Sequence, residues 1–172
     1  TMLPNNVGYL RLISFANEKL YDQLIAEIDD LKAQGATSLV LDLRNNGGGL
    51  LQQGVLVSDA FLNSGDIVFT RARGVTQRIA SADENWVDMP MVVVVNQNSA
   101  SASEIVAGAL QENGRAKVIG EKTYGKGVAQ NVIPLSDGGQ LLLVAFEWLT
   151  PNRNSIQEEG ITPDIYAEDT AT

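Results

Sequence analysis

The sequence contains neither histidine nor cysteine. The absence of histidine excludes a Ser-His-Asp triad, a histidine-assisted cysteine protease and a histidine-based zinc site. The absence of cysteine excludes disulfides, thiolate metal clusters and thiol nucleophiles, and it leaves the redox compartment undetermined. Any catalysis must therefore use serine, threonine, lysine, tyrosine or a carboxylate, and no metal or other cofactor is expected.

Basic residues are also scarce. Lysine and arginine total 12 against 21 aspartates and glutamates, which gives a formal net charge of -9, and no basic run offsets this locally. Nucleic acid and an anionic membrane surface are therefore not expected as partners. The apolar run from Met91 to Val95 is far too short to span a bilayer, and the N-terminus shows no signal-peptide pattern.

The composition is that of one globular domain. The chain has 172 residues, 44% of them hydrophobic, and no repeat, low-complexity tract or linker divides it, so we expect residues 1–172 to form a single domain. Short apolar runs alternate with segments of helical periodicity, which predicts an α/β fold. The predicted strands are 7–13, 38–43, 66–73, 75–79, 91–95, 117–119, 130–135 and 140–147; the predicted helices are 20–34, 50–62 and 104–113.

A glycine-rich loop, Arg44 to Gly49, lies between a predicted buried strand and a predicted helix. Its spacing does not match a dinucleotide-binding fingerprint, because Gln52 stands where that pattern needs glycine. Two interpretations remain, and they are compatible: a loop that needs positive φ or close backbone approach, and a loop whose N–H groups bind an anion or oxyanion.

A second glycine-containing segment, Gly120 to Lys126, matches the first seven positions of a phosphate-binding loop. The eighth position is Gly127, where that motif needs serine or threonine to bind magnesium, and the residues after it read as a strand where a helix is required. Nucleotide binding is therefore not expected. Lys126 is left either in an ordinary surface loop or as a lysine with a special role.

A small-residue segment, Asn98 to Glu104, precedes the third predicted helix. Ser101 and Glu104 have the spacing of a capping box, which is the structural interpretation. The functional interpretation is that Ser101, flanked by alanines, sits at a helix N-terminus where backbone N–H groups stabilise a developing oxyanion.

Together these loops suggest a specific chemistry. A serine nucleophile needs a base, and without histidine the available base near neutral pH is a lysine with a lowered pKa, for which Lys126 is the candidate. Lowering a lysine pKa from about 10.4 to roughly 7.5 costs on the order of 4 kcal/mol. We therefore expect the site around Lys126 to be desolvated and to lack a strong carboxylate partner.

Four motifs, in this order, closely resemble those of the carboxyl-terminal processing proteases, also called tail-specific proteases, of peptidase family S41. They are LDLRNNGGG from Leu41, NSASASEIVAGAL from Asn98, GEKTYGKGVAQ from Gly120 and GITPDI from Gly160. The resemblance spans nearly the whole chain. It implies the crotonase and ClpP-like arrangement of repeated β-β-α units, with mixed sheets packed against helices.

The resemblance also implies roles for individual residues. Ser101 matches the family nucleophile, Lys126 the lysine base of a Ser-Lys dyad, and Gln130 the residue that orients the lysine amine. The oxyanion hole is expected from the backbone N–H groups of Ala102 and Gly47. The implied activity is that of a serine endopeptidase that cleaves proteins near their C-termini through an acyl-enzyme, and the implied substrates are proteins or peptides with apolar C-termini.

The chain departs from the family pattern in two places. Family members usually carry a PDZ domain before the strand that opens this chain, and no PDZ domain is present in it. The segment Pro151 to Ser155 lacks the glycine that is common there. The family implies the bacterial periplasm or envelope, or a thylakoid lumen, and it leaves a homo-oligomer open.

Two alternatives to an active protease remain. The same fold serves in retinoid-binding proteins, so a non-catalytic module for apolar ligands is one, although it would have no need of the dyad. The other is a resting core in which Ser101 and Lys126 lie too far apart to hydrogen-bond until a PDZ domain or a substrate activates it.

Overall fold

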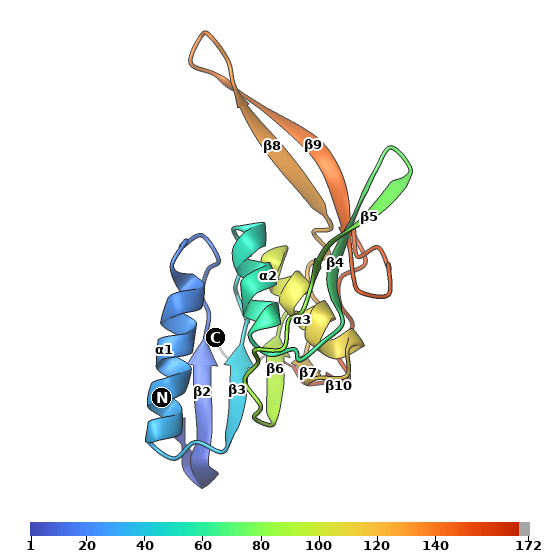
Figure 1. The fold of residues 1–172 in the computed structure, drawn as a ribbon. Coiled ribbons are helices and arrows are strands. Elements are labelled where there is room, and N and C mark those ends of the chain that lie inside the picture. The colour runs from blue at the N-terminus through green and yellow to red at the C-terminus, as the bar shows by residue number, and fades with distance from the viewer. Residues whose placement is uncertain (169–172) are drawn as a thin grey trace.

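The computed structural model describes residues 1–168, which form two β-sheets and three α-helices (Figure 1). The helices are α1 (Leu20–Ala33), α2 (Leu51–Asp59) and α3 (Ala102–Glu112), with a short 3-10 turn, η1 (Pro4–Asn6). The strands are β1 (Met2–Leu3), β2 (Val7–Arg11), β3 (Ser38–Asp42), β4 (Asp66–Ala72), β5 (Val75–Ser81), β6 (Met91–Val95), β7 (Lys117–Gly120), β8 (Val128–Pro134), β9 (Gln140–Leu149) and β10 (Ile165–Tyr166).

The larger sheet places three loops at one edge. Its strand order is β1-β2-β3-β6-β7-β10, and every neighbouring pair is parallel except β1 with β2. The carboxyl ends of parallel strands meet at the same edge, where ligand sites of open α/β sheets form. The loops after β3, β6 and β7 are the glycine-rich loop, the nucleophile segment and the lysine loop, so the fold brings these three segments together.

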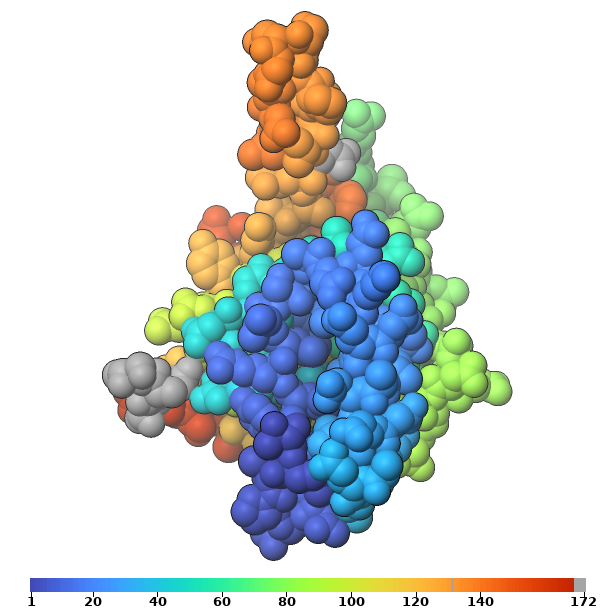
Figure 2. Space-filling view, turned by 90° about the vertical axis from the view of Figure 1, so that its left-hand side faces the viewer, coloured from blue at the N-terminus to red at the C-terminus, as the bar shows by residue number. Residues whose placement is uncertain are grey.

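The smaller sheet is antiparallel, with strand order β5-β4-β9-β8. Strands β8 and β9 form a long hairpin that projects from the body of the molecule (Figure 1), and it stands as a narrow prong in the space-filling view (Figure 2). Strand β8 is one of the two edge strands of this sheet and begins immediately after the loop that carries Lys126.

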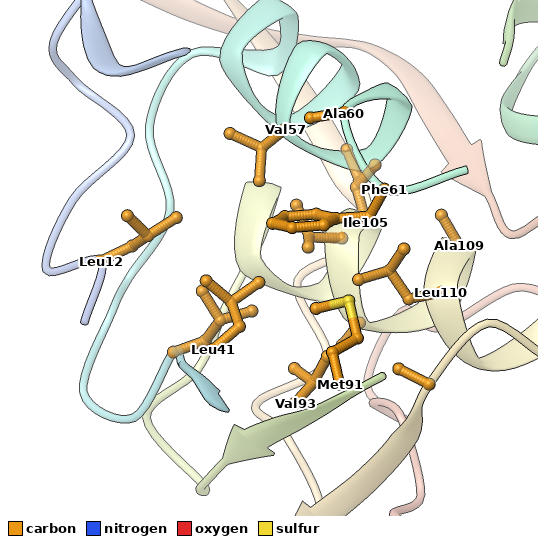
Figure 3. Close-up of a cluster of buried hydrophobic side chains, with 14 of the residues drawn as sticks. Leu12, Leu41, Val57, Ala60, Phe61, Met91, Val93, Ile105, Ala109 and Leu110 are labelled. Atoms are coloured by element: carbon orange, nitrogen blue, oxygen red, sulfur yellow. The ribbon is translucent and has the colours of Figure 1, made fainter. Parts of the chain in front are cut away.

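The hydrophobic core lies between the larger sheet and helices α1, α2 and α3. Leu41 on β3 and Val93 on β6 face Phe61 and Ile105 in Figure 3, and all four side chains are buried. Helix α3 is buried along nearly its whole length, and small residues such as Ala107 and Ala109 let it pack closely. The N-terminus of this helix is therefore held rigidly by the core.

The sequence predicts most of these elements. The α/β prediction is confirmed, and the segment after Lys126 is the predicted strand and not the helix that follows a phosphate-binding loop. Helix α2 ends at Asp59, earlier than predicted, because the N–H groups of Phe61 and Leu62 bond to carbonyls three residues back and tighten the last turn. Strand β10 was not predicted.

Candidate active site

Ser101 and Lys126 line the same cavity, which has a volume of about 410 Å³. Gln130, on β8, lines it as well. Apolar side chains form much of the rest of the cavity wall: Leu50, Leu51, Ile105, Val128, Val132, Leu142, Phe146 and Trp148. The structure thus brings together the three side chains that the sequence analysis proposed for catalysis.

Ser101 has a strained backbone. It is the N-cap residue of α3, with φ 57° and ψ -116°, a conformation that residues with a Cβ rarely adopt. Such strain persists only where the surrounding structure enforces it, and it is concentrated at functional sites. The carbonyl oxygen of Ser101 accepts hydrogen bonds from the N–H groups of Glu104 and Ile105, which fixes the first turn of the helix.

The N–H groups expected to form the oxyanion hole belong to Gly47 and Ala102, neither of which is among the residues that line the cavity, whereas Gly49 of the same loop is. Among the hydrogen bonds within residues 1–168, the N–H groups of Gly47 and Ala102 donate to no protein acceptor. The N–H of Gly48, in contrast, donates to Asn46 Oδ1 at 2.9 Å. Because Ala102 is the first residue of α3, its N–H also carries the positive end of the helix dipole. This arrangement can stabilise a negatively charged oxygen.

The glycine-rich loop packs directly against the nucleophile segment. A Cβ atom at Gly48, whose φ is +92°, would lie 2.8 Å from Ser101 Cβ and 2.7 Å from the Ala100 carbonyl oxygen. Asn46 fastens the two segments, because its carbonyl oxygen accepts hydrogen bonds from the Ala100 N–H and the Ser103 hydroxyl. Glycine at position 48 is therefore a steric requirement.

Glu104 connects Ser101 to the loop that carries Lys126. Its side chain is fully buried, and its Oε2 atom accepts hydrogen bonds from the N–H groups of Ser101 at 2.8 Å and Lys126 at 2.9 Å. Its Oε1 atom accepts from the Thr123 hydroxyl at 2.6 Å and the Gly125 N–H at 2.7 Å. The predicted capping-box pairing of Ser101 with Glu104 is present, and the same carboxylate also holds the lysine loop.

The environment of Lys126 differs from the expectation. Lys126 is exposed, so the predicted desolvation is absent in this arrangement. No hydrogen bond joins Lys126 Nζ to Ser101 Oγ among the contacts of the described residues. The nearby Glu104 carboxylate accepts a hydrogen bond from the backbone N–H of Lys126. Its other hydrogen bonds also come from uncharged donors. The expectation of a dry lysine pocket was wrong because lysine exposure depends on what covers the cavity, which sequence periodicity does not reveal.

Trp148 holds the backbone of the lysine loop from the other side. Its indole N–H donates to the Lys126 carbonyl oxygen at 3.0 Å, and its own backbone N–H donates to the Gly127 carbonyl oxygen at 2.8 Å. The side chain is 2% exposed and lines the cavity. Sequence reasoning missed this residue, because nothing in its local pattern distinguishes it from an ordinary core tryptophan.

A buried charge supports the glycine-rich loop at its start. The Asp42 side chain is inaccessible and pairs with Arg44, whose Nη2 lies 2.7 Å from Asp42 Oδ2; the Tyr9 hydroxyl donates to the same oxygen at 2.6 Å. Burial alone would raise the pKa of Asp42, but the hydrogen bonds from Arg44 and Tyr9 outweigh it and hold that pKa below its ordinary value. The pKa of Tyr9 is raised, first by its burial and second by its hydrogen bond to Asp42.

Within residues 1–168, no group of three or more aspartate or glutamate side chains is arranged to hold a metal ion. No helix in the same range is long and apolar enough to cross a membrane.

The sequence matches peptidase family S41 over residues 6–167. The chain belongs to this family. It is 48% identical to the carboxy-terminal-processing protease of Bartonella bacilliformis, over 96% of this chain and 40% of that protein. It is 46% identical to the carboxyl-terminal-processing protease of Picosynechococcus, over 92% of this chain and 38% of that protein. The chain thus spans about two fifths of the length of these curated relatives.

The fold matches solved structures of the family. The photosystem II D1 C-terminal processing protease superimposes with a TM-score of 0.87 at 38% identity, over 97% of this chain and 45% of that chain. The S41 resemblance and the fold that it implied are therefore confirmed.

Proposed function

We propose that this chain is the catalytic part of a C-terminal processing peptidase of serine type, with Ser101 as nucleophile and Lys126 as general base. The observation that supports this most is the shared cavity: Ser101, at the N-terminus of α3, and Lys126, in the loop after β7, both line it. Membership of family S41 points to the same activity.

The proposed reaction follows from this arrangement. Neutral Lys126 removes the proton of the Ser101 hydroxyl, and the oxygen attacks the scissile carbonyl carbon. The N–H groups of Ala102 and Gly47 bind the oxyanion that forms. The protonated lysine then protonates the leaving amine, and water hydrolyses the acyl-enzyme by the same route. Gln130 is proposed to orient the lysine amine.

The exposed position of Lys126 makes this arrangement a resting one in our proposal. A substrate that fills the cavity would exclude water from the lysine amine and bring it toward Ser101, so substrate binding itself completes the dyad. The apolar wall suits protein or peptide substrates with apolar C-termini. The compartment implied by the resemblance, a bacterial envelope or a thylakoid lumen, remains part of the proposal.

The test uses three variants and an unfolded protein substrate with an apolar C-terminus. Ser101→Ala and Lys126→Met are each expected to abolish cleavage while remaining folded by circular dichroism. Lys122→Met is the matched control, because Lys122 lies in the same loop, is also exposed and pairs with Glu159 at 3.6 Å. Cleavage that survives in Ser101→Ala or Lys126→Met contradicts the assignment, and so does an equal loss in Lys122→Met.

A further inference from the structure

The β8–β9 hairpin presents large apolar side chains to solvent on both of its faces. Val132 and Leu142 are 55% and 57% exposed, and Ile133 and Leu143 are 42% and 46% exposed. A projecting two-stranded ribbon cannot bury such residues in its own core, and exposed apolar patches of this kind mark interaction surfaces.

The two faces of the hairpin lead to different places. Val132 is paired with Leu142 in the ladder, and both line the cavity that contains Ser101. Ile133 and Leu143 belong to the opposite face, because side chains alternate along a strand, and they line a depression beside Arg71 on β4. Of these two pairs, only Val132 and Leu142 line the cavity of the candidate active site.

The outer edge of β8 is open. Strand β8 ends the order of its sheet, so within residues 1–168 no strand pairs with the edge that faces away from β9. Its residues, from Val128 to Ile133, carry no charge. Pro134 at the end of the strand has no N–H group and limits further pairing toward the tip. Such an edge accepts an extended, uncharged polypeptide by main-chain hydrogen bonding.

We propose that β8 is the docking strand for the substrate: an extended apolar segment of the substrate adds to its open edge, and the face formed by Val132 and Leu142 supports the substrate side chains. This inference rests on the proposed function. The added strand would run from the hairpin to the base of β8, which begins two residues after Lys126, and so would deliver the neighbouring peptide bond to Ser101. Main-chain recognition would tolerate many sequences, while the apolar face would select uncharged ones.

The first test measures peptide binding, so that it does not depend on turnover. The probe is a fluorescein-labelled, uncharged peptide of valine, leucine and alanine with a free C-terminus, and the protein is the whole chain carrying Ser101→Ala. Adding Val132→Gln and Leu142→Gln together is expected to raise the Kd by about tenfold in fluorescence anisotropy. The matched control adds Ile133→Gln and Leu143→Gln, which change the same strands on the opposite face and are expected to change the Kd by less than about twofold.

The second test separates strand addition from binding in an apolar groove without main-chain pairing. Two versions of the peptide are N-methylated at alternate positions, one at the odd and one at the even residues. In an added strand only every second N–H faces the partner edge. One version is therefore expected to bind at least about tenfold more weakly than the other.

The outcomes separate this inference from the proposed function. Equal effects of the two pairs of substitutions, no effect of either pair, equal affinity of the two methylated peptides, or no binding of the unmethylated peptide would each overturn strand addition to β8. Failure of a fluorophosphonate to label Ser101 in the unsubstituted chain, both with and without the peptide, would instead count against the proposed nucleophile.

Discussion

Glu104 Oε2 accepts the backbone N–H of Lys126 at 2.9 Å and, on its other side, the backbone N–H of Ser101 at 2.8 Å. One buried carboxylate thus fixes the distance between the two segments that carry the proposed nucleophile and base. Each of its oxygens is saturated by neutral donors, which is how a buried negative charge without a cation is stabilised.

Substitution of Glu104 by glutamine is expected to damage both stability and activity. The side-chain amide would direct N–H groups toward backbone N–H groups, and leaving such buried donors unpaired costs about 1–3 kcal/mol. We expect Glu104→Gln to lower the free energy of unfolding in urea by about 2 kcal/mol and to reduce kcat for a peptide substrate by at least about 100-fold, because the lysine loop loses its anchor.

Glu112, near the opposite end of α3, provides the control. Its carboxylate accepts hydrogen bonds from the Thr150 hydroxyl, the Asn152 N–H and the Asn154 side-chain amide. Glu112→Gln should therefore lower stability while leaving kcat within about twofold of the unsubstituted chain. An equal loss of kcat in both variants would show that Glu104 acts through stability alone.

The two adjacent glycines of the loop are expected to respond differently to alanine. At Gly48 a Cβ would collide with backbone atoms of Ala100 and Ala102, and φ is +92°; at Gly47 a Cβ would meet nothing within 4 Å. Gly48→Ala should abolish peptide cleavage and lower the melting temperature. Gly47→Ala keeps the N–H group that we assign to the oxyanion hole, so cleavage should persist. Loss of activity in Gly47→Ala with an unchanged fold would contradict the steric account.

The strain at Ser101 makes a prediction about stability. A non-glycine residue held at such a φ costs of order 1–3 kcal/mol, and glycine adopts this conformation without the cost of a Cβ. After allowance for the greater freedom of glycine in the unfolded chain, Ser101→Gly should be more stable than Ser101→Ala by about 1 kcal/mol. Urea unfolding of the two inactive variants measures this directly, and a less stable glycine variant would show that the backbone at Ser101 is unstrained.

The lowered pKa of Asp42 predicts that the protein loses stability in acid. Its pKa is lowered in the folded state by the hydrogen bonds from Arg44 and Tyr9, which outweigh its burial. A lowered folded pKa contributes stability that is fully present above the unfolded value of about 4 and is lost as the pH falls through the folded value. In Asp42→Asn this part of the pH dependence should disappear, as measured by urea unfolding between about pH 2.5 and about pH 7.

Asp29 is the control for that experiment, because its side chain is 69% exposed and its contact with Lys32 is 3.9 Å long. The loss of folding stability at acid pH should persist in Asp29→Asn. If Asp42→Asn retained the same acid loss as the unsubstituted chain, the pairing with Arg44 would not stabilise the folded state.

Local patterns predicted the fold where the elements are long or strongly apolar. The helical spacing of Leu20, Leu24 and Ile28 predicted α1, and the valines of β6 predicted a central strand. Strand β10 could not be predicted this way. It has two residues, and the segment before it is held by tertiary bonds: Asp164 donates its N–H to the Val118 carbonyl, and the Asp164 carboxylate accepts the Val118 N–H.

The candidate site was predictable in its residue types and less so in its geometry. Ser101, Lys126, Gln130, Gly47 and Ala102 lie on loops or chain segments whose motifs are local, so the sequence could suggest them. The hydrogen bonds from the lysine loop to the Glu104 carboxylate, and the hydrogen bond from the Trp148 indole to the Lys126 carbonyl oxygen, join segments that are distant in sequence. The exposure of Lys126 likewise depends on the whole surface around the cavity and not on its neighbours in the chain.

The central claim, that Ser101 is the nucleophile and Lys126 its base, is tested most directly by covalent labelling. The unsubstituted chain and Lys126→Met are each treated with a fluorophosphonate, with and without an uncharged apolar peptide, and the modified residue is mapped by mass spectrometry. The account predicts that the peptide promotes an adduct on Ser101 in the unsubstituted chain and that this adduct is lost in Lys126→Met. An adduct on another residue, or equal labelling of Ser101 when Lys126 is replaced, would contradict it.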